Sequence, residues 1–308
     1  MPFPTPLTGV VPPVCTPLTP EREVDVPSLL RLVDHLVGGG VHGLFLLGST
    51  SEAAFLTDRQ RRQVVEAVVA HVDGRLPVLA GAIDMTTPRV LDHVAAVTAA
   101  GADAVVVTAP FYARTHRSEI VHHYRRIAGA SPVPVIAYDI PAAVHTRLPA
   151  DVVLGLAADE VLAGIKDSSG DLAAFREIVT GARAHPGFSV LTGSELIVDS
   201  ALALGADGAV PGLANVDPHG YVRLYRMCRA GDWEGARGEQ ERLCALFGMV
   251  TAGDPARMGG SSSALGAFKA ALHLRGVIAC GVTAEPQVPL SGEEVERVGK
   301  FLAAAGLL

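Results

Sequence analysis

The chain alternates two patterns of apolar residues. Short continuous apolar runs are typical of buried parallel strands, and apolar residues at helical spacing are typical of amphipathic helices. The segments predicted as strands are 10–15, 42–47, 77–80, 104–108, 134–138, 161–166, 188–191 and 208–211. The segments predicted as helices are 26–37, 57–72, 87–100, 118–127, 149–157, 171–184 and 197–204, and another begins near Asp217.

This alternation predicts a closed barrel. Short connections between successive strands and helices require parallel pairing with helical crossovers, and eight such units make a (β/α)8 TIM barrel. We therefore expect an α/β fold with the barrel in residues 1–230. An open doubly wound sheet is the alternative, but it would carry a glycine fingerprint after the first strand, where the chain reads Thr16-Pro17-Leu18. Helical patterns in residues 231–308 predict a C-terminal helical extension packed on the barrel.

Composition and charge exclude several classes of protein. The 308 residues are 49% hydrophobic, with mean hydropathy +0.34, yet no charge-free apolar run is long enough to cross a membrane. Residues 1–14 lack the basic stretch and apolar core of a signal peptide. A net charge of -7 and a pI near 5.9, without a basic cluster, argue against a nucleic-acid partner.

The four cysteines are widely spaced and form no metal-ligand pattern. We expect Cys15, Cys228, Cys244 and Cys280 to be reduced core residues of a cytoplasmic protein. The sequence therefore indicates no metal site and no other cofactor.

The stretch 161–171, VLAGIKDSSGD, ends an apolar strand in a single lysine. The chain has two other lysines, Lys269 and Lys300, and uses arginine for most of its positive charge. A dry strand end favours the neutral, nucleophilic amine, which can form a Schiff base where arginine cannot. The alternative is a structural lysine whose stem lies along apolar surface and whose amine reaches water. Lys166 is thus a candidate nucleophile.

Other polar side chains follow neighbouring strands. The turn Gly48-Ser49-Thr50-Ser51-Glu52 follows the second strand, TAPFY ends in Tyr112 after the fourth, and Tyr138 ends the fifth. The carboxyl ends of barrel strands meet on one face, so these groups are expected near Lys166. Backbone N–H groups and hydroxyls of a Gly-led turn can hold a carboxylate, although such runs often form only a turn. A phenol can carry the protons of a Schiff-base reaction, and a hydroxyl can bridge two phenols.

Four segments, GSTSEAAFLT, TAPFY, YDIP and GIKDSSGD, resemble in order and spacing the dihydrodipicolinate synthase / N-acetylneuraminate lyase family. The resemblance extends from about Thr8 to Leu272. It implies a class I, Schiff-base, pyruvate-dependent aldolase on a TIM barrel, which needs no metal or other cofactor and is commonly a homo-oligomer, a dimer or tetramer. The implied partner is a small 2-keto acid, bound as an imine.

The resemblance also implies roles for individual residues. Lys166 matches the imine lysine, and Tyr138 the acid/base above it. Tyr112 matches a second tyrosine that enters the neighbouring subunit's site and relays protons through the hydroxyl of Ser49.

The substrate-binding positions match as well. Ser49 and Thr50 correspond to the two hydroxyl residues that hold the keto-acid carboxylate. Val210 corresponds to an apolar residue beside the bound keto acid, and Gly193 lies on the loop that helps to choose the second substrate.

Departures from the family pattern concern the second substrate. The synthases have an arginine that grips aspartate semialdehyde where this chain has Ala143, and they have threonine and glycine where it has Ser49 and Ser51. The sialic-acid lyases have a carboxylate and a serine where it has Leu196 and Gly212.

Three functions fit these residues. The favoured one is a Schiff-base lyase or aldolase, or a dehydratase, acting on a 2-keto-3-deoxy acid. The second is a 4-hydroxy-tetrahydrodipicolinate synthase that uses Arg147 or His145 in place of the missing arginine. The third is a non-catalytic binding or regulatory paralogue, against which stands the retention of Lys166, Tyr138 and Tyr112. A pyridoxal-phosphate enzyme is disfavoured because the late segment GAVPGLAN is too apolar for a phosphate cradle.

Overall fold

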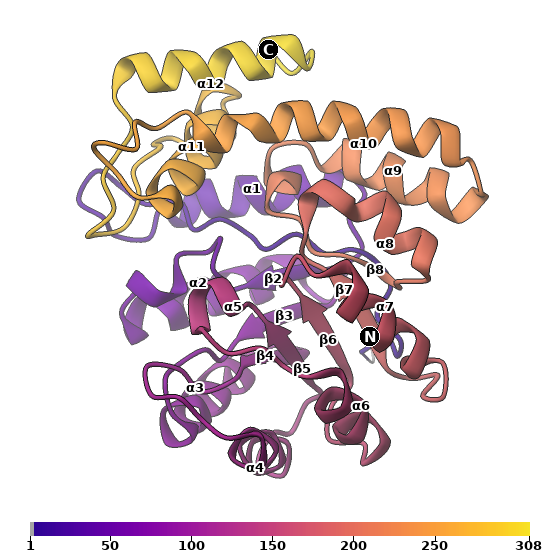
Figure 1. The fold of residues 1–308 in the computed structure, drawn as a ribbon. Coiled ribbons are helices and arrows are strands. Elements are labelled where there is room, and N and C mark those ends of the chain that lie inside the picture. Colours follow the sequence, from indigo (N-terminus) through magenta and orange to yellow (C-terminus); the bar gives the residue numbers. More distant parts are fainter. Residues whose placement is uncertain (1–2) are drawn as a thin grey trace.

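A computed structural model describes residues 3–308, and in this range eight parallel strands form one curved sheet (Figure 1). The strands are β1 (Gly9–Val10), β2 (Leu44–Leu46), β3 (Val78–Gly81), β4 (Ala104–Thr108), β5 (Val135–Asp139), β6 (Gly164–Asp167), β7 (Ser189–Thr192) and β8 (Gly208–Ala209). Their order is β1-β8-β7-β6-β5-β4-β3-β2. The predicted (β/α)8 barrel is confirmed.

The seam between β1 and β2 is closed by backbone hydrogen bonds beyond the regular ladder. The N–H of Phe45 donates to the carbonyl of Pro12 over 2.9 Å, and the N–H of Val14 donates to the carbonyl of Phe45 over 2.8 Å. Strand β1 was predicted over 10–15 but is shorter, because Pro12 and Pro13 have no N–H to offer a ladder.

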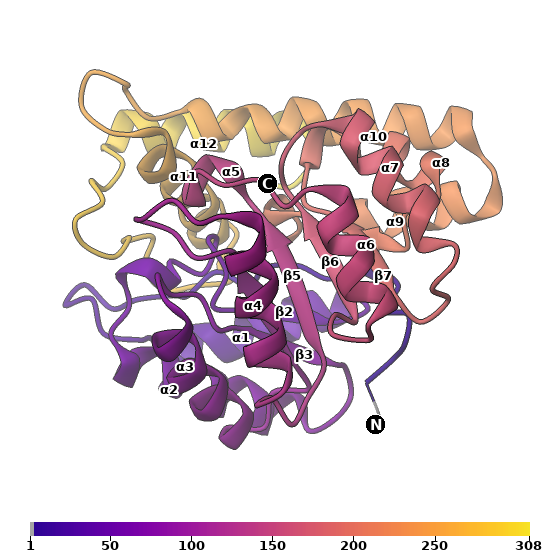
Figure 2. The same cartoon turned by 60° about the horizontal axis from the view of Figure 1, so that its bottom comes forward.

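Helices follow the strands and surround them (Figure 2). They are α1 (Val26–Gly38), α2 (Asp58–Val72), α3 (Thr87–Ala99), α4 (Arg117–Ala128), α6 (Ala150–Ala158), α7 (Leu172–Ala182), α8 (Val198–Leu204) and α9 (Pro218–Ala230). Some of these helices begin at a side-chain cap: Thr57 and Gln60 form a capping box on α2, and Asp171 accepts hydrogen bonds from two N–H groups of α7. A further short helix, α5 (Pro141–Val144), was not predicted.

The strands separate two apolar layers. Alternate residues of each strand point to opposite faces. Ile136 and Tyr138 of β5 therefore lie in the cluster inside the barrel, while Val135 and Ala137 lie in the larger cluster between strands and helices. The same alternation governs which strand residues can reach the barrel interior and take part in a site.

The C-terminal residues form α10 (Trp233–Phe247), α11 (Gly260–Leu274) and α12 (Gly292–Ala304). Figure 1 shows α10 and α12 lying across one side of the barrel, with α10 beside α9. The predicted helical extension is present, and the division of the chain at residue 230 into two parts stays a prediction. No helix within residues 3–308 is both long and apolar enough to span a membrane.

The cysteines agree only partly with the expectation. All four are free thiols. Cys15 and Cys228 are buried, as predicted, but Cys244 and Cys280 are only half-buried. Cys244 was wrongly placed in the core because it lies on the half-exposed side of α10.

Candidate active site

Lys166 and Tyr138 are direct neighbours across strands β5 and β6. The parallel register pairs their Cα positions, so both side chains point into the barrel. The Lys166 ammonium nitrogen lies 4.0 Å from the centroid of the Tyr138 ring and 5.0 Å from that of Phe45. Lys166 is 5% exposed and Tyr138 is 3% exposed. The amine of Lys166 is therefore buried at the carboxyl end of a strand and lies over two aromatic rings.

The turn after β2 brings a hydroxyl to the same place. The Ser49 Oγ lies 3.5 Å from the Tyr138 hydroxyl, at the limit of a hydrogen bond. Ser49 is exposed and Thr50 half-buried, whereas Ser51 and Glu52 are buried. The turn thus presents two hydroxyls toward the barrel mouth and anchors itself through the next two side chains.

Ser51 explains one departure from the family pattern. Its hydroxyl donates to the carbonyl of Val14 over 2.6 Å and accepts from the N–H of Gly48 over 3.2 Å. The hydroxyl of Thr16 donates to the carbonyl of Ser51 over 2.8 Å. The serine therefore ties the turn to the segment that follows β1.

The loops after β7 and β8 complete the group of residues. A Cβ built on Gly212 would lie 3.2 Å from the Thr50 hydroxyl and 3.3 Å from Oε1 of Glu195. Thr50 and Glu195 therefore both lie close to this glycine. Val210 is 3% exposed and belongs to the same interior cluster as Tyr138.

Glu195 was not identified from the sequence. It begins the short helix η2 (Glu195–Ile197), and its Oε1 accepts a hydrogen bond from the N–H of Leu213 over 2.6 Å. Burial raises the pKa of this carboxyl to about 7, against the opposing effects of the Leu213 N–H and the charge of Lys166. Its position two residues after Gly193, at the carboxyl end of a strand, was the signal that could have found it.

Two more carboxyl groups belong to the residues that follow Tyr138 and Lys166 in the sequence. Asp139 and Asp167 are paired in the strand register and, by alternation, point out of the barrel, where both are buried. Burial raises the pKa of Asp139 to about 6, and the neighbouring Asp167 adds to the effect. Arg147 donates to Asp139 through Nε and to Asp171 through Nη1, each over 3.2 Å.

The side chain of Tyr112 lies on the surface of the single chain and not beside Lys166. Its side chain is 94% exposed, and its backbone has a φ of 75°, which is unusual for a residue with a side chain. It borders a surface cavity of about 610 Å³ that is also lined by Met85, Pro110 and Phe111.

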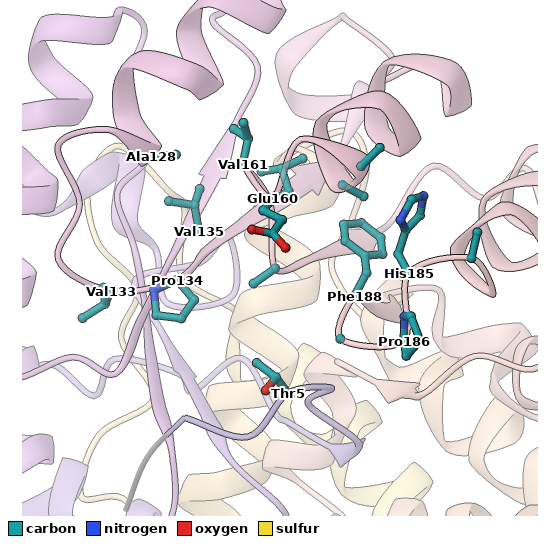
Figure 3. Close-up of a pocket in the computed structure, with 16 residues that line it drawn as sticks. Thr5, Ala128, Val133, Pro134, Val135, Glu160, Val161, His185, Pro186 and Phe188 are labelled. Carbon is teal, nitrogen blue, oxygen red and sulfur yellow. The ribbon is translucent and has the colours of Figure 1, made fainter.

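Another cavity, of about 600 Å³, lies at the opposite end of the barrel (Figure 3). Val133, Pro134 and Val161, which line it, precede strands β5 and β6, and Phe188 precedes β7. The amino-terminal face of a TIM barrel serves stability, whereas chemistry occurs at the carboxyl ends. This cavity is therefore distinct from the candidate site.

Comparisons with known proteins agree with this geometry. The sequence model of the Dihydrodipicolinate synthetase family matches residues 6–305. The chain belongs to this family. Family members are class I lyases and aldolases, so the protein is an enzyme of that type.

Three relatives within the dihydrodipicolinate synthetase family illustrate its range. An uncharacterized DapA-like lyase of Halobacterium salinarum is 36% identical over 98% of this chain and 95% of its own length. A 4-hydroxy-tetrahydrodipicolinate synthase of Methanospirillum hungatei is 33% identical over 78% of this chain and 82% of its own.

YagE of Escherichia coli, provisionally named a 2-dehydro-3-deoxy-D-gluconate aldolase, is 33% identical over 78% of this chain and 80% of its own length. Its crystal structure in complex with pyruvate matches with a TM-score of 0.90 and 29% identity, over 98% of this chain and 99% of that one.

Gly193 has no side chain, and we expect this to be needed because Ser168 and Lys166 occupy the adjacent space. A Cβ at this position would lie 2.1 Å from the Ser168 hydroxyl and 2.9 Å from Cε of Lys166. Gly193→Ala should displace Lys166, the candidate nucleophile, and lower kcat/KM by about tenfold to a hundredfold, because a small misplacement of a group that reacts with substrate is costly.

The control for this change is Gly187→Ala, in the loop before β7, where an added Cβ would meet nothing within 4 Å. Steady-state kinetics of both variants, with circular dichroism to confirm folding, would make the comparison. Equal kinetics for the two variants would contradict the steric role of Gly193.

Proposed function

We propose that the protein forms an imine between Lys166 and a 2-keto acid and uses it to cleave or dehydrate a 2-keto-3-deoxy acid. The observation that carries this proposal is the placement of the Lys166 amine 4.0 Å from the Tyr138 ring centroid, with the Ser49 hydroxyl 3.5 Å from the Tyr138 hydroxyl. Amine, phenol and hydroxyl are the groups that a Schiff-base reaction needs.

The proposed reaction begins with attack of the Lys166 amine on the C2 carbonyl of the substrate, and a water molecule leaves as the imine forms. The positively charged imine then accepts the electron pair of the breaking C3–C4 bond, while Tyr138 takes the proton of the C4 hydroxyl and an aldehyde departs. Protonation at C3 and hydrolysis of the imine release pyruvate. In dehydration, a C3 proton and the C4 hydroxyl leave instead, and the C3–C4 bond is kept.

Ser49 and Thr50 are proposed to hold the carboxylate of the keto acid, with N–H groups of their turn. Val210 is proposed to pack beside its methyl or methylene group. Ser49 and Thr50 follow β2, and Val210 follows β8, so all three lie at the carboxyl ends of strands. Val210 also belongs to the interior cluster that contains Tyr138.

The surroundings of Arg147 favour a hydroxylated second part of the substrate over aspartate semialdehyde. Arg147 is already engaged by Asp139 and Asp171, and Ala143 is exposed without a charge to offer. Glu195, by contrast, can accept hydrogen bonds from hydroxyls and, when ionised, would repel a second carboxylate. The provisional name of YagE points to the same substrate class.

Side-by-side kinetics test the proposed substrate class. We expect kcat/KM for cleavage or dehydration of a 2-keto-3-deoxy sugar acid to exceed that for condensation of pyruvate with aspartate semialdehyde by at least about tenfold. The reason is that a charged hydrogen bond to the semialdehyde carboxylate, worth roughly 1.5–3 kcal/mol, is missing.

Pyruvate release and water loss would both be monitored with each sugar acid. An Arg147→Ala variant is the control for the alternative function. Faster condensation in the wild type, lost in this variant, would identify a 4-hydroxy-tetrahydrodipicolinate synthase that uses Arg147 instead.

A homo-oligomer, a dimer or tetramer, is also proposed. Tyr112 and Met85 are 94% and 44% exposed beside one apolar cavity, a surface that a second copy could cover. In such an assembly Tyr112 would enter the partner's site as the second tyrosine of the proton relay. The cytoplasmic location expected from the sequence stays a prediction.

A further inference from the structure

We propose that Glu52 and Lys269 are positioning residues. Through them the C-terminal extension sets the backbone geometry of residues 48–53, called here the hydroxyl turn. This inference rests on the proposed function, in which Ser49 and Thr50 hold the keto-acid carboxylate. Neither Glu52 nor Lys269 touches the reacting atoms. Their effect is transmitted through the backbone of the hydroxyl turn.

Glu52 and Lys269 form an ion pair whose two side chains are both 0% exposed. The second carboxylate oxygen of Glu52 accepts a hydrogen bond from the N–H of Ala284 over 2.6 Å. The Lys269 ammonium also donates to the carbonyl of Val282 over 2.9 Å. Since a buried charge is costly without a partner, each side chain fixes the position of the other.

The ion pair joins segments that are far apart in the sequence. Glu52 lies in the hydroxyl turn after β2, Lys269 lies on α11, and Val282 and Ala284 lie in the connection between α11 and α12. Within residues 3–308 the other ion pairs each include at least one side chain that is partly exposed, so this pair has the most complete burial.

The hydroxyl turn needs such an anchor because its backbone is strained. Glu52 has a φ of 60° and a ψ of 27°, a left-handed conformation that a residue with a Cβ adopts only when its surroundings impose it. The N–H of Glu52 donates to the carbonyl of Ser49 over 3.0 Å, and that of Ser51 donates to the carbonyl of Gly48 over 3.1 Å. A relaxed Glu52 would therefore move Ser49 and Thr50.

A second contact leads from α11 to the same site. Phe268, which precedes Lys269, has its ring 3.0 Å from where a Cβ of Gly212 would lie, and Thr50 is 3.2 Å from that point. The extension thus approaches the carboxylate-binding turn from two adjacent residues of one helix. The C-terminal extension therefore helps to position the candidate site, in addition to packing on the barrel.

The test compares Glu52→Gln, Lys269→Met and the double variant with a control pair. The control, Glu294→Gln and Arg257→Met, breaks an ion pair between α12 and the segment before α11, whose hydrogen-bond partners include no residue of the hydroxyl turn. Thermal melting and circular dichroism identify the folded variants. Hydrogen exchange of the turn amides and the pyruvate dependence of borohydride trapping on Lys166 are then measured.

We expect exchange of the turn amides to be at least about tenfold faster in the Glu52 and Lys269 variants. Half-saturation by pyruvate should require at least about tenfold more ligand, as expected when a charged hydrogen-bond anchor is lost. The trapping rate at saturating pyruvate should change much less. The double variant should recover thermal stability, since neither charge is left unpaired, without recovering pyruvate affinity.

Unchanged pyruvate affinity in the folded double variant would overturn the inference, and so would equal changes in the control pair. Failure of the proposed function is a separate result. It would appear as an absence of trapped pyruvate in the wild type, and hydrogen exchange of the turn amides would then decide the inference alone. Exchange as slow in the Lys269→Met variant as in the wild type would refute it.

Discussion

Lys166→Met should abolish pyruvate trapping and lower kcat by at least about 10⁴-fold, the scale expected when a covalent nucleophile is removed. Methionine keeps an unbranched apolar stem on the platform formed by Phe45 and Tyr138, so the barrel interior should stay packed. The missing amine removes the imine and with it the electron sink of the reaction. Borohydride reduction with pyruvate, followed by peptide mass spectrometry, would show the adduct in the wild type and none in the variant.

The other lysines give the control for this experiment. Lys300 is exposed on α12, and Lys300→Met should leave trapping and kcat unchanged. Lys269 is fully buried in its ion pair with Glu52 and is not available to a substrate. An adduct on either of these lysines, or normal turnover by Lys166→Met, would be incompatible with the proposed mechanism.

Tyr138→Phe should lower kcat by about 10²–10⁴-fold, the usual contribution of a general acid or base. The ring and its contact with Lys166 remain, so the substrate should bind with little change in KM and the loss should appear in kcat. Imine formation should also slow, because the amine and the departing water need the same proton carrier. Steady-state kinetics and the rate of borohydride trapping would measure the two effects.

Tyr124→Phe is the matched control. Tyr124 on α4 is fully buried outside the barrel, where its hydroxyl donates to the carbonyl of Val107 over 3.1 Å. Removing that hydroxyl should cost about 1 kcal/mol of unfolding free energy and leave kcat unchanged. Near-normal kcat in Tyr138→Phe would show that the phenol does not carry the protons.

Much of the fold could be predicted because strands and helices differ in the period of their apolar residues, and because several helices begin at a recognisable side-chain cap. Strand β4 has the same bounds in the structure as in the prediction, 104–108, since five consecutive apolar or β-branched residues mark where the strand begins and ends. Strand β1 could not be predicted as well, because Pro12 and Pro13 interrupt its hydrogen bonding without interrupting its apolar pattern. Helix α5 is too short to show a helical period.

The proximity of the candidate site residues was predictable where a strand ends in a residue with a reactive side chain, although their roles stay predictions. Lys166, Tyr138 and Ser49 do meet, because parallel strands bring their carboxyl ends to one face. Glu195 was missed because a charged residue beyond a strand end usually faces water, and only the tertiary structure shows its contact with the N–H of Leu213.

Tyr112 marks a different limit of sequence reasoning. Its neighbours within the chain leave it exposed, so any role at a reaction centre depends on a second copy.

The seam between β1 and β2 bears on how the enzyme would lose activity on heating. Pro12 and Pro13 have no N–H to donate at this seam, whereas every residue of the four pairs that join β5 to β6 carries one. Weakly paired elements open first in local unfolding. The hydroxyl turn is tied to this seam through Ser51, while Lys166 and Tyr138 belong to the stronger ladder. Heat inactivation should therefore precede the melting of the sheet, because the turn proposed to bind the carboxylate would lose its position while Lys166 and Tyr138 are still in place.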